Sequence, residues 1–134
     1  MNWDKINAAI EIAEKLQYFF IATADKEGCP HVTTAGEIRL KSEEVVEVSF
    51  WFCPKTIDNL EKNKQVSLII WDAGKNAGYQ LLGKAEDVEV AQVMDEADTA
   101  IGEEKYLLQA RWFLVVRVDT VMEFIHALHN DVAL

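Results

Sequence analysis

Short runs of aromatic and β-branched residues recur along the chain, and clusters of turn-forming residues separate them. Such runs are typical of β-strands, and the clusters between them are typical of turns. The runs occupy residues 18–23, 31–40, 45–52, 65–71, 79–89 and 111–118. The connecting segments are too short and irregular for the helical crossovers that parallel strands need. The pattern predicts a mainly β fold with peripheral helices, in which five or six antiparallel strands, and we take six, close into a small barrel.

Glycines mark three points in this pattern. Gly28 follows Asp25-Lys26-Glu27 and is free to take the positive φ that a hairpin turn requires. Gly36 predicts a weak point or bulge within the run 31–40, and Gly83 predicts a bend or a close backbone approach within the run 79–89.

Three segments carry helical signals. Residues 6–16 place apolar side chains at three- and four-residue spacing behind Asp4, a residue type that caps helices well. A short helix is expected at 55–63, and a third, amphipathic helix at 90–101. The tail 122–134 fits either an extension of the last strand or a short helix.

The net charge of the chain excludes some classes of binding partner. The 134 residues carry a formal net charge of −10, which repels phosphate backbones and anionic lipids. We therefore expect neither nucleic-acid nor membrane-surface binding. No apolar run reaches the roughly 18 residues that span a bilayer, and residues 1–5 lead into a helix instead of a signal peptide. We expect a cytoplasmic protein with a single domain over residues 1–134.

The cysteines and histidines predict no metal site. Cys29 and Cys53 share no CxxC or zinc spacing, so two reduced thiols are expected. Cys29 and His31 would lie on one side of an extended strand, but no third orienting group accompanies them. His126 and His129 would share a helix face, and they too lack a third ligand.

The start of the helix at 55–63 has the chemistry of a phosphate site. The terminus offers unpaired backbone N–H groups and a partial positive charge, and Lys55 and Thr56 add a cation and a hydroxyl donor. Thr33 and Thr34 add two more hydroxyls, of which only one can face a given pocket. A simpler interpretation is also open, in which Thr56 caps the helix, Lys55 is solvated and the paired threonines only favour a strand.

An aromatic run precedes that helix. Phe50, Trp51 and Phe52 stand together, and strict alternation would put Trp51 on one face, with Val46, Val48, Phe50 and Phe52 on the other. Trp71 and Tyr79 are further large aromatic residues. All five aromatics can simply fill the core. However, one face of the run must leave the barrel interior, which predicts dimerisation, a flat ring ligand, or both.

The order of these elements resembles the pyridoxamine 5'-phosphate oxidase-like, FMN-binding split-barrel superfamily. Residues 21–32 resemble its first hairpin, residues 55–68 its helix followed by a strand, and residues 78–86 its next strand. The similarity covers roughly residues 17–120, and the small FMN-binding proteins of the superfamily are the nearest type.

The resemblance implies a split-barrel homodimer with two FMN molecules at the subunit interface. It assigns the FMN phosphate to Thr33, Thr34, Lys55 and Thr56, and the isoalloxazine ring to the backbone of Ser49, Phe50 and Trp51. Trp71 or Tyr79 would border the ring, and Trp112 of the second subunit would cover it. The oxidase has phosphate-binding arginines where this chain has Thr33-Thr34-Ala35, and a C-terminal arginine–histidine segment that this chain lacks. Oxidation of pyridoxamine phosphate is therefore not expected.

Three functions remain open on this evidence. The first is an FMN-dependent oxidoreductase or electron carrier, in which the flavin supplies the redox chemistry and no protein nucleophile or base is needed. The second is a non-catalytic flavin or haem binding or sensor module on the same dimeric barrel. The third is a structural dimer with a vestigial pocket. A deazaflavin is an alternative to FMN in the first two.

Overall fold

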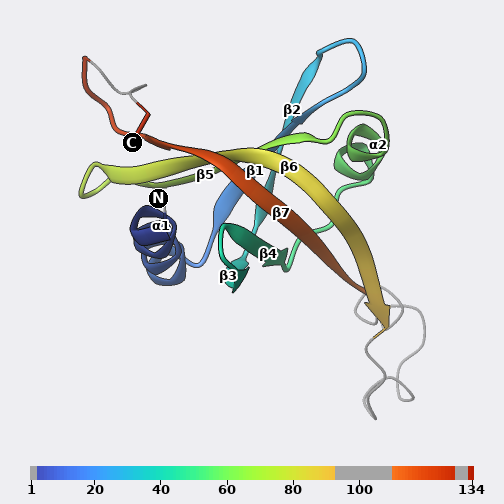
Figure 1. Cartoon of the computed structure of the whole chain (residues 1–134), viewed down its shortest axis with the longest axis horizontal. Helices are drawn as coiled ribbons and strands as arrows, with labels where there is room; N and C mark the ends of the chain where they lie inside the picture. Colours follow the sequence, from blue (N-terminus) through green and yellow to red (C-terminus); the bar gives the residue numbers. More distant parts are fainter. Residues whose placement is uncertain (1–2, 93–109, 129–132) are drawn as a thin grey trace.

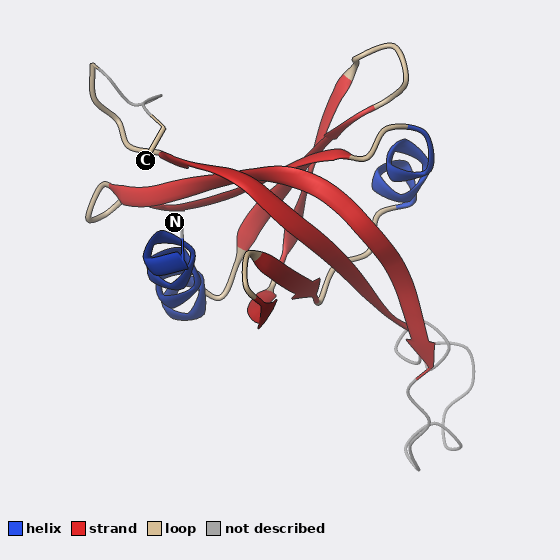
Figure 2. Cartoon of the chain, in the orientation of Figure 1, coloured by secondary structure: helices blue, strands red, loops and turns tan. Residues whose placement is uncertain are grey.

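The computed structural model describes residues 3–92, 110–128 and 133–134. It contains two helices and seven strands in these residues (Figures 1 and 2). In chain order they are α1 (Trp3–Leu16), β1 (Phe19–Ala24), β2 (Pro30–Ala35), β3 (Glu37–Ser42), β4 (Val45–Ser49), α2 (Pro54–Lys62), β5 (Gln65–Asp72), β6 (Ala77–Gln92) and β7 (Ala110–Glu123). None of the described helices is long and apolar enough to cross a membrane.

All described strand pairs are antiparallel, in the order β2-β1-β5-β6-β7-β4-β3. The two outermost strands, β2 and β3, follow each other in the chain with only Gly36 between them. The sheet therefore curls until its two ends meet at Gly36, as a barrel requires. This confirms the predicted mainly β, antiparallel barrel. The predicted strand 31–40 is divided at Gly36, so seven strands are present where six were expected.

The core lies inside this curled sheet, and α1 packs against one side of it. The predicted apolar stripe of α1 is buried, as Ile6, Ala9, Ile10 and Ala13 show. Strands contribute most of the largest wholly buried side chains, among them Phe19, Ile21, Leu68, Ile70, Leu81, Leu114 and Val121. The second helix, α2, packs on β1 and β2 at a distance from α1 (Figure 1).

Two expected elements end differently. The run 45–52 leaves the sheet after Ser49, because Phe50 adopts a left-handed conformation with φ of 61°. The strict alternation predicted for this run is therefore wrong beyond Ser49. Residues 90–92 belong to β6, so the expected helix at 90–101 is wrong at its start, and residues 93–101 lie outside the described residues. For the tail, β7 continues to Glu123, in favour of the strand alternative.

Candidate functional site

The N-terminus of α2 has no side-chain hydrogen bond from its N-cap residue. Cys53 occupies the N-cap position in an extended conformation, and its side chain makes no capping hydrogen bond. Pro54 stands in the first turn, where a missing N–H costs nothing. The first amides of the helix, from Lys55 onward, therefore lack a side-chain acceptor from the cap residue, while the Lys55 side chain is exposed.

Thr56, on the first turn of α2, is wholly buried with 0% exposure. Its Oγ1 has no hydrogen-bond partner within the described part of the chain. One turn later, the equally buried Asn59 donates from Nδ2 to Thr23 Oγ1 of β1 over 3.0 Å. This bond anchors α2 to the barrel. Thr56 is thus held rigidly, yet its hydroxyl is left for another acceptor.

The pairing register decides which threonine of β2 faces α2. Thr33 pairs with Ile21 and His31 pairs with Thr23, so both share the face on which Thr23 meets α2. Thr34 points the other way and is exposed. The structure therefore brings the Thr33 side chain toward α2, and leaves Thr34 only its backbone for the same site. His31 Nδ1 is buried and, among the described residues, unpaired.

The Cys53 sulfur shows how closely these donors converge. Partial burial alone would raise the pKa of the Cys53 thiol. The Thr56 hydroxyl, the backbone N–H groups of Thr56 and Lys55, and the Thr33 hydroxyl all favour the thiolate, and the net effect is a lowered pKa. Groups of three of the predicted phosphate residues therefore act on the Cys53 sulfur and would favour its charged form, although Cys53 makes no capping hydrogen bond and Thr56 Oγ1 has no partner among the described residues. We call the Thr33 hydroxyl, the Thr56 hydroxyl, the Lys55 side chain and the first amides of α2 the anion cradle.

The predicted ring-binding segment lies directly before α2. Ser49 is buried and donates from Oγ to Glu37 Oε1 over 3.2 Å. Trp51 is only 6% exposed, and its Nε1 has no partner among the residues described. Its ring lies 6.2 Å from that of Trp112, which also lies 5.8 Å from Phe52. Trp51, Phe52 and Trp112 therefore form an aromatic cluster at the entrance to α2.

Trp71 is not brought to this cluster within one chain. It stands near the end of β5, beside the turn to β6, on the opposite side of the barrel from α2 (Figure 1). Its Nε1 donates to Asn76 Oδ1 over 3.2 Å, and its ring lies 6.0 Å from Phe124. Tyr79 pairs with Ile70 at the same end of the barrel. A role for Trp71 at the ring stays a prediction that needs a second subunit.

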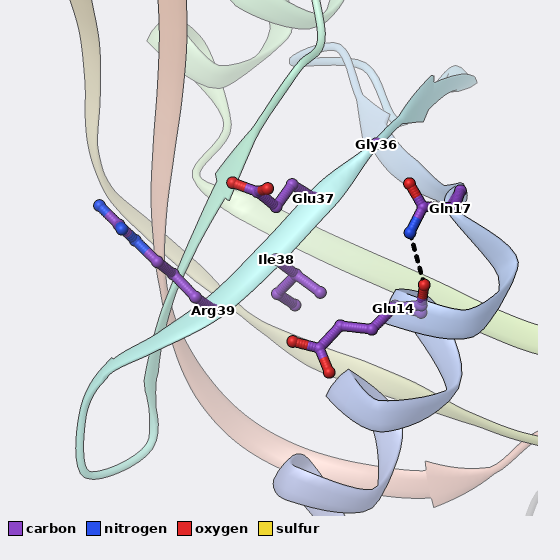
Figure 3. Close-up of a pocket in the computed structure, with 7 residues that line it drawn as sticks. Glu14, Gln17, Gly36, Glu37, Ile38 and Arg39 are labelled. Carbon is purple, nitrogen blue, oxygen red and sulfur yellow. Dashed lines mark hydrogen bonds between the residues drawn. The ribbon is translucent and has the colours of Figure 1, made fainter.

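Two cavities have relevant positions. One, of about 290 Å³, lies between α1 and β3, where Glu14 and Gln17 face the strand (Figure 3). None of the predicted site residues lines it, so it gives them no support. The other, of about 320 Å³, lies beside α2 and is lined by Ile57, Leu60 and Trp112 among others. Its lining also includes the carboxylates of Glu61, Glu86 and Asp87, and none of the anion-cradle residues lines it, so it does not extend the cradle. No group of three metal-ligating side chains occurs in the described ranges.

Sequence reasoning missed two residues of this region. The sequence analysis predicts only a reduced thiol at Cys53, although its place directly before Pro54 and Lys55 indicates an N-cap next to a cation. The sequence pattern groups His31 with Cys29, whereas the strand register puts His31 in one row with Thr33. The alternation of β2 was the available signal for this pairing.

The chain matches known proteins along most of its length. The family model of pyridoxamine 5'-phosphate oxidase matches residues 4–124. An uncharacterized protein of Methanocaldococcus jannaschii is 33% identical over 87 residues, or 61% of this chain. The chain spans 58% of the length of that relative in this match.

Solved structures share the fold at low sequence identity. HupZ of Group A Streptococcus superposes with a TM-score of 0.63 at 16% identity, covering 94% of this chain and 97% of its own. A pyridoxamine 5'-phosphate oxidase-related, FMN-binding protein of Nostoc punctiforme gives 0.60 at 11% identity, covering 92% and 84%. HutZ, the heme storage protein of Vibrio cholerae, gives 0.52 at 18% identity, covering 93% and 97%. With the family model matching most of the sequence, the chain belongs to the pyridoxamine 5'-phosphate oxidase-like, FMN-binding split-barrel family.

Proposed function

We propose that this protein binds FMN, with the phosphate of the cofactor in the anion cradle. The observation that carries the proposal is the Thr56 hydroxyl, which is wholly buried and lacks a partner in the part of the chain that is described. A buried hydroxyl without a partner costs about 1–3 kcal/mol. A phosphate oxygen would accept from it and remove this cost.

The electrostatics of the cradle support a phosphate in an otherwise acidic protein. The formal net charge of −10 repels anions over most of the surface. At the cradle, the start of α2 and the Thr33 hydroxyl favour an anion. The exposed Lys55 side chain belongs to the same first turn, and its charge also acts on Asp25. The family relationship and the FMN-binding relative from Nostoc punctiforme make FMN the phosphate ester to test first.

The chain's own residues have defined tasks in this proposal. FMN supplies the redox chemistry when it is bound, as a hydride or single-electron acceptor. The cradle holds the phosphate, with Thr34 contributing at most its backbone. The backbone of 49–51 orients the ring, and the aromatic cluster excludes water from one of its faces. We place Trp71 at the ring of the neighbouring copy in a homodimer, because it lies on the far side of the barrel from the cradle.

The proposed reaction class is flavin-dependent oxidoreduction or electron transfer with a small partner. Pyridoxamine phosphate is not the expected substrate, because Thr33, Thr34 and Ala35 stand where the oxidase has arginines. Steady-state reduction by NADH or NADPH separates an enzyme from a binding module. Rapid bleaching of the flavin absorbance supports the enzyme, whereas a tightly bound but unreactive flavin supports the module.

The proposal is tested first by the absorbance spectrum of the purified protein and by mass spectrometry of the released ligand. Flavin absorbance that follows the protein is expected, and a colourless protein that also ignores added FMN contradicts the proposal. Lys55→Ala should weaken FMN binding by about 1.5–3 kcal/mol, because a charge-assisted contact is lost. Lys62→Ala, at the other end of α2 and also exposed, is the matched control and should leave affinity unchanged.

A haem module is the second candidate, because one imidazole has a free nitrogen. His31 Nδ1 is buried and unpaired among the described residues, and haem needs an axial ligand. The same spectrum decides between the two cofactors. A Soret band that is lost in His31→Ala would show that the cofactor is haem and not FMN. The absorbance of a released deazaflavin would show that the cofactor is a deazaflavin.

A further inference from the structure

Two asparagine side chains, one helical turn apart, attach α2 to β1. Asn59 donates from Nδ2 to Thr23 Oγ1 over 3.0 Å, and Asn63 donates from Nδ2 to the carbonyl oxygen of Asp25 over 3.3 Å. Asn59 and Thr23 are both buried, so water does not compete for their bond. A hydrogen bond is directional, whereas the apolar contacts of the neighbouring Leu60 are not and would tolerate a slip of the helix along the strand.

These two bonds determine the level at which α2 lies along β1. The earlier asparagine meets Thr23 and the later one meets Asp25, so the helix and the strand run in the same direction. Four helix residues advance about 6 Å and two strand residues about 6.6 Å, so the two spacings agree. Thr56 precedes the earlier asparagine by about 4.5 Å along the helix, which places it at the level of residues 21–22 of β1.

The sheet register places Thr33 at that same level. Ile21 is the buried residue of β1 there, and it pairs with Thr33 of β2. Thr56 and Asn59 lie on the same buried face of α2. The bond from Asn59 therefore holds the Thr56 hydroxyl and the first amides of α2 beside Thr33. A slip of one residue along the helix would move these donors by about 1.5 Å, which exceeds the tolerance of a hydrogen bond to a fixed acceptor.

We propose that Asn59 is a positioning residue for the anion cradle: its hydrogen bond to Thr23 keeps the donors of α2 and β2 at the spacing that a phosphate needs. Neither side chain touches the phosphate. Two apolar side chains of the same shape could replace this buried polar pair at little cost in stability, so the pair is explained by the orientation that it imposes. The inference rests on the proposed function, because it concerns the phosphate of the same site.

The experiment compares FMN with riboflavin, which has the same ring and ribityl chain but no phosphate. The wild-type protein should bind FMN more tightly by about tenfold or more, as expected for hydrogen bonds to a charged group. Thr23→Val should reduce this ratio by about fivefold, because the phosphate depends on the position of α2 and the ring does not. Riboflavin affinity should stay unchanged. Thr23→Ser keeps the hydroxyl and should keep the wild-type ratio.

A double variant separates positioning from stability. In Thr23→Val the Asn59 amide loses its acceptor, so this variant should unfold at a lower denaturant concentration. Thr23→Val combined with Asn59→Leu removes both polar groups, so its unfolding midpoint should return toward that of the wild-type protein. Its preference for FMN over riboflavin should stay low. Ser67→Ala, which removes the acceptor of a 2.7 Å bond from Gln80 between β5 and β6, is the matched control and should keep the preference.

Three results would overturn the role of Asn59 and leave the proposed function intact. The first is a Thr23→Val protein with the wild-type ratio, and the second is one in which FMN and riboflavin weaken equally. The third is a double variant that recovers both its stability and its preference for FMN, since packing alone would then position α2. A wild-type protein that does not prefer FMN to riboflavin contradicts the phosphate site itself, and the role of Asn59 fails with it.

Discussion

Two buried polar side chains on α2 differ in whether they have a hydrogen-bond partner. Asn59 is satisfied by Thr23 across the helix–strand contact, so its burial is compensated. Thr56 is buried as deeply, yet its Oγ1 has no partner among the described residues. A fold that leaves one hydroxyl unpaired next to a satisfied amide gives up stability at that point, as binding sites often do.

Thr56→Val tests whether the unpaired hydroxyl lowers stability and serves ligand binding, because valine keeps the shape of the side chain and removes the hydroxyl. The free energy of unfolding of the ligand-free protein should rise by about 1 kcal/mol, since an unpaired buried group is lost. FMN affinity should fall about tenfold, since a phosphate partner is lost with it. Denaturant unfolding measures the expected rise in stability, and FMN titration measures the expected fall in affinity.

Thr56→Ser is the matched control, because it keeps the hydroxyl that the cradle needs. Its FMN affinity should stay close to that of the wild-type protein. A valine variant that is less stable and binds FMN normally would show that Thr56 is a structural residue with no ligand.

Asp25 organises the β1–β2 turn through its carboxylate. Oδ1 accepts from the backbone N–H of Cys29 and of Glu27, each over 2.9 Å. The Cys29 amide is the largest cause of the lowered pKa of Asp25. Desolvation opposes it, and the Glu27 amide, the charge of Lys55 and the Gly28 amide add to the lowering. The turn therefore depends on an ionised side chain, together with Gly28 at φ of 92°.

The lowered pKa gives a definite pH dependence. A depressed native pKa means that the carboxylate stabilises the fold above its unfolded pKa of about 3.9, and that this stabilisation is lost as pH falls through the native value. Wild-type protein should therefore be more stable than Asp25→Ala at pH 6, and the difference should shrink below about pH 4. Unfolding curves of both proteins from pH 2.5 to 6 measure it. A difference that is constant over this range would contradict the assignment.

Strand ends and bulges shape the barrel as much as the strands do. The left-handed Phe50 ends β4 and turns Trp51 inward, and the Gly36 amide donates to the Phe50 carbonyl oxygen over 3.1 Å. At Gly83 the register of β6 against β7 shifts. A Cβ at Gly83 would overlap the carbonyl oxygen of Arg117, which confirms the close backbone approach predicted there.

Gly83→Ala should therefore cost about 3 kcal/mol or more in free energy of unfolding, because the β6 and β7 backbones would have to separate. Gly74→Ala is the matched control, since the nearest atom to its Cβ would lie 3.4 Å away, in ordinary contact. That control should change stability by less than about 0.5 kcal/mol. Chemical denaturation of both variants makes the comparison, and equal effects would contradict the packing at Gly83.

The whole molecule carries apolar surface that a monomer does not explain. Phe50 and Phe52 are 55% and 63% exposed, on either side of the buried Trp51. The sequence predicted that one whole face of this run leaves the barrel, but Phe50 and Phe52 are exposed while Val46 and Val48, predicted on the same face, are buried. We propose that a second copy of the chain covers them, as the family resemblance implies.

Light scattering after size exclusion should then give twice the mass of the chain. Phe52→Asp should shift the protein toward monomer, because a charge would be buried at the interface. Leu128→Asp, at a position that is 95% exposed, should not. Raising the salt concentration should tighten the dimer, since each copy carries a net charge of −10. A monomeric wild-type protein at micromolar concentration would contradict the proposal.

Local patterns were enough for much of this protein. The α1 stripe, the 25–28 turn, the start of α2, the break at Gly36 and the contact at Gly83 all follow from residues within a few positions of one another. Propensity, capping and glycine geometry act over that range. The order of these elements was also enough to indicate the family.

The other features of the candidate site depend on contacts between strands that are far apart in the sequence. The direction in which Thr33 faces depends on its pairing with Ile21, and the burial of Trp51 depends on the left-handed Phe50 beside it. The separation of Trp71 from the cradle depends on how β5 crosses the barrel. A shift of one residue in the pairing of a strand moves its side chains to the opposite face of the sheet. The residues that meet at α2 therefore depend on strand register and on where strands end, and both are determined by residues far away in the sequence.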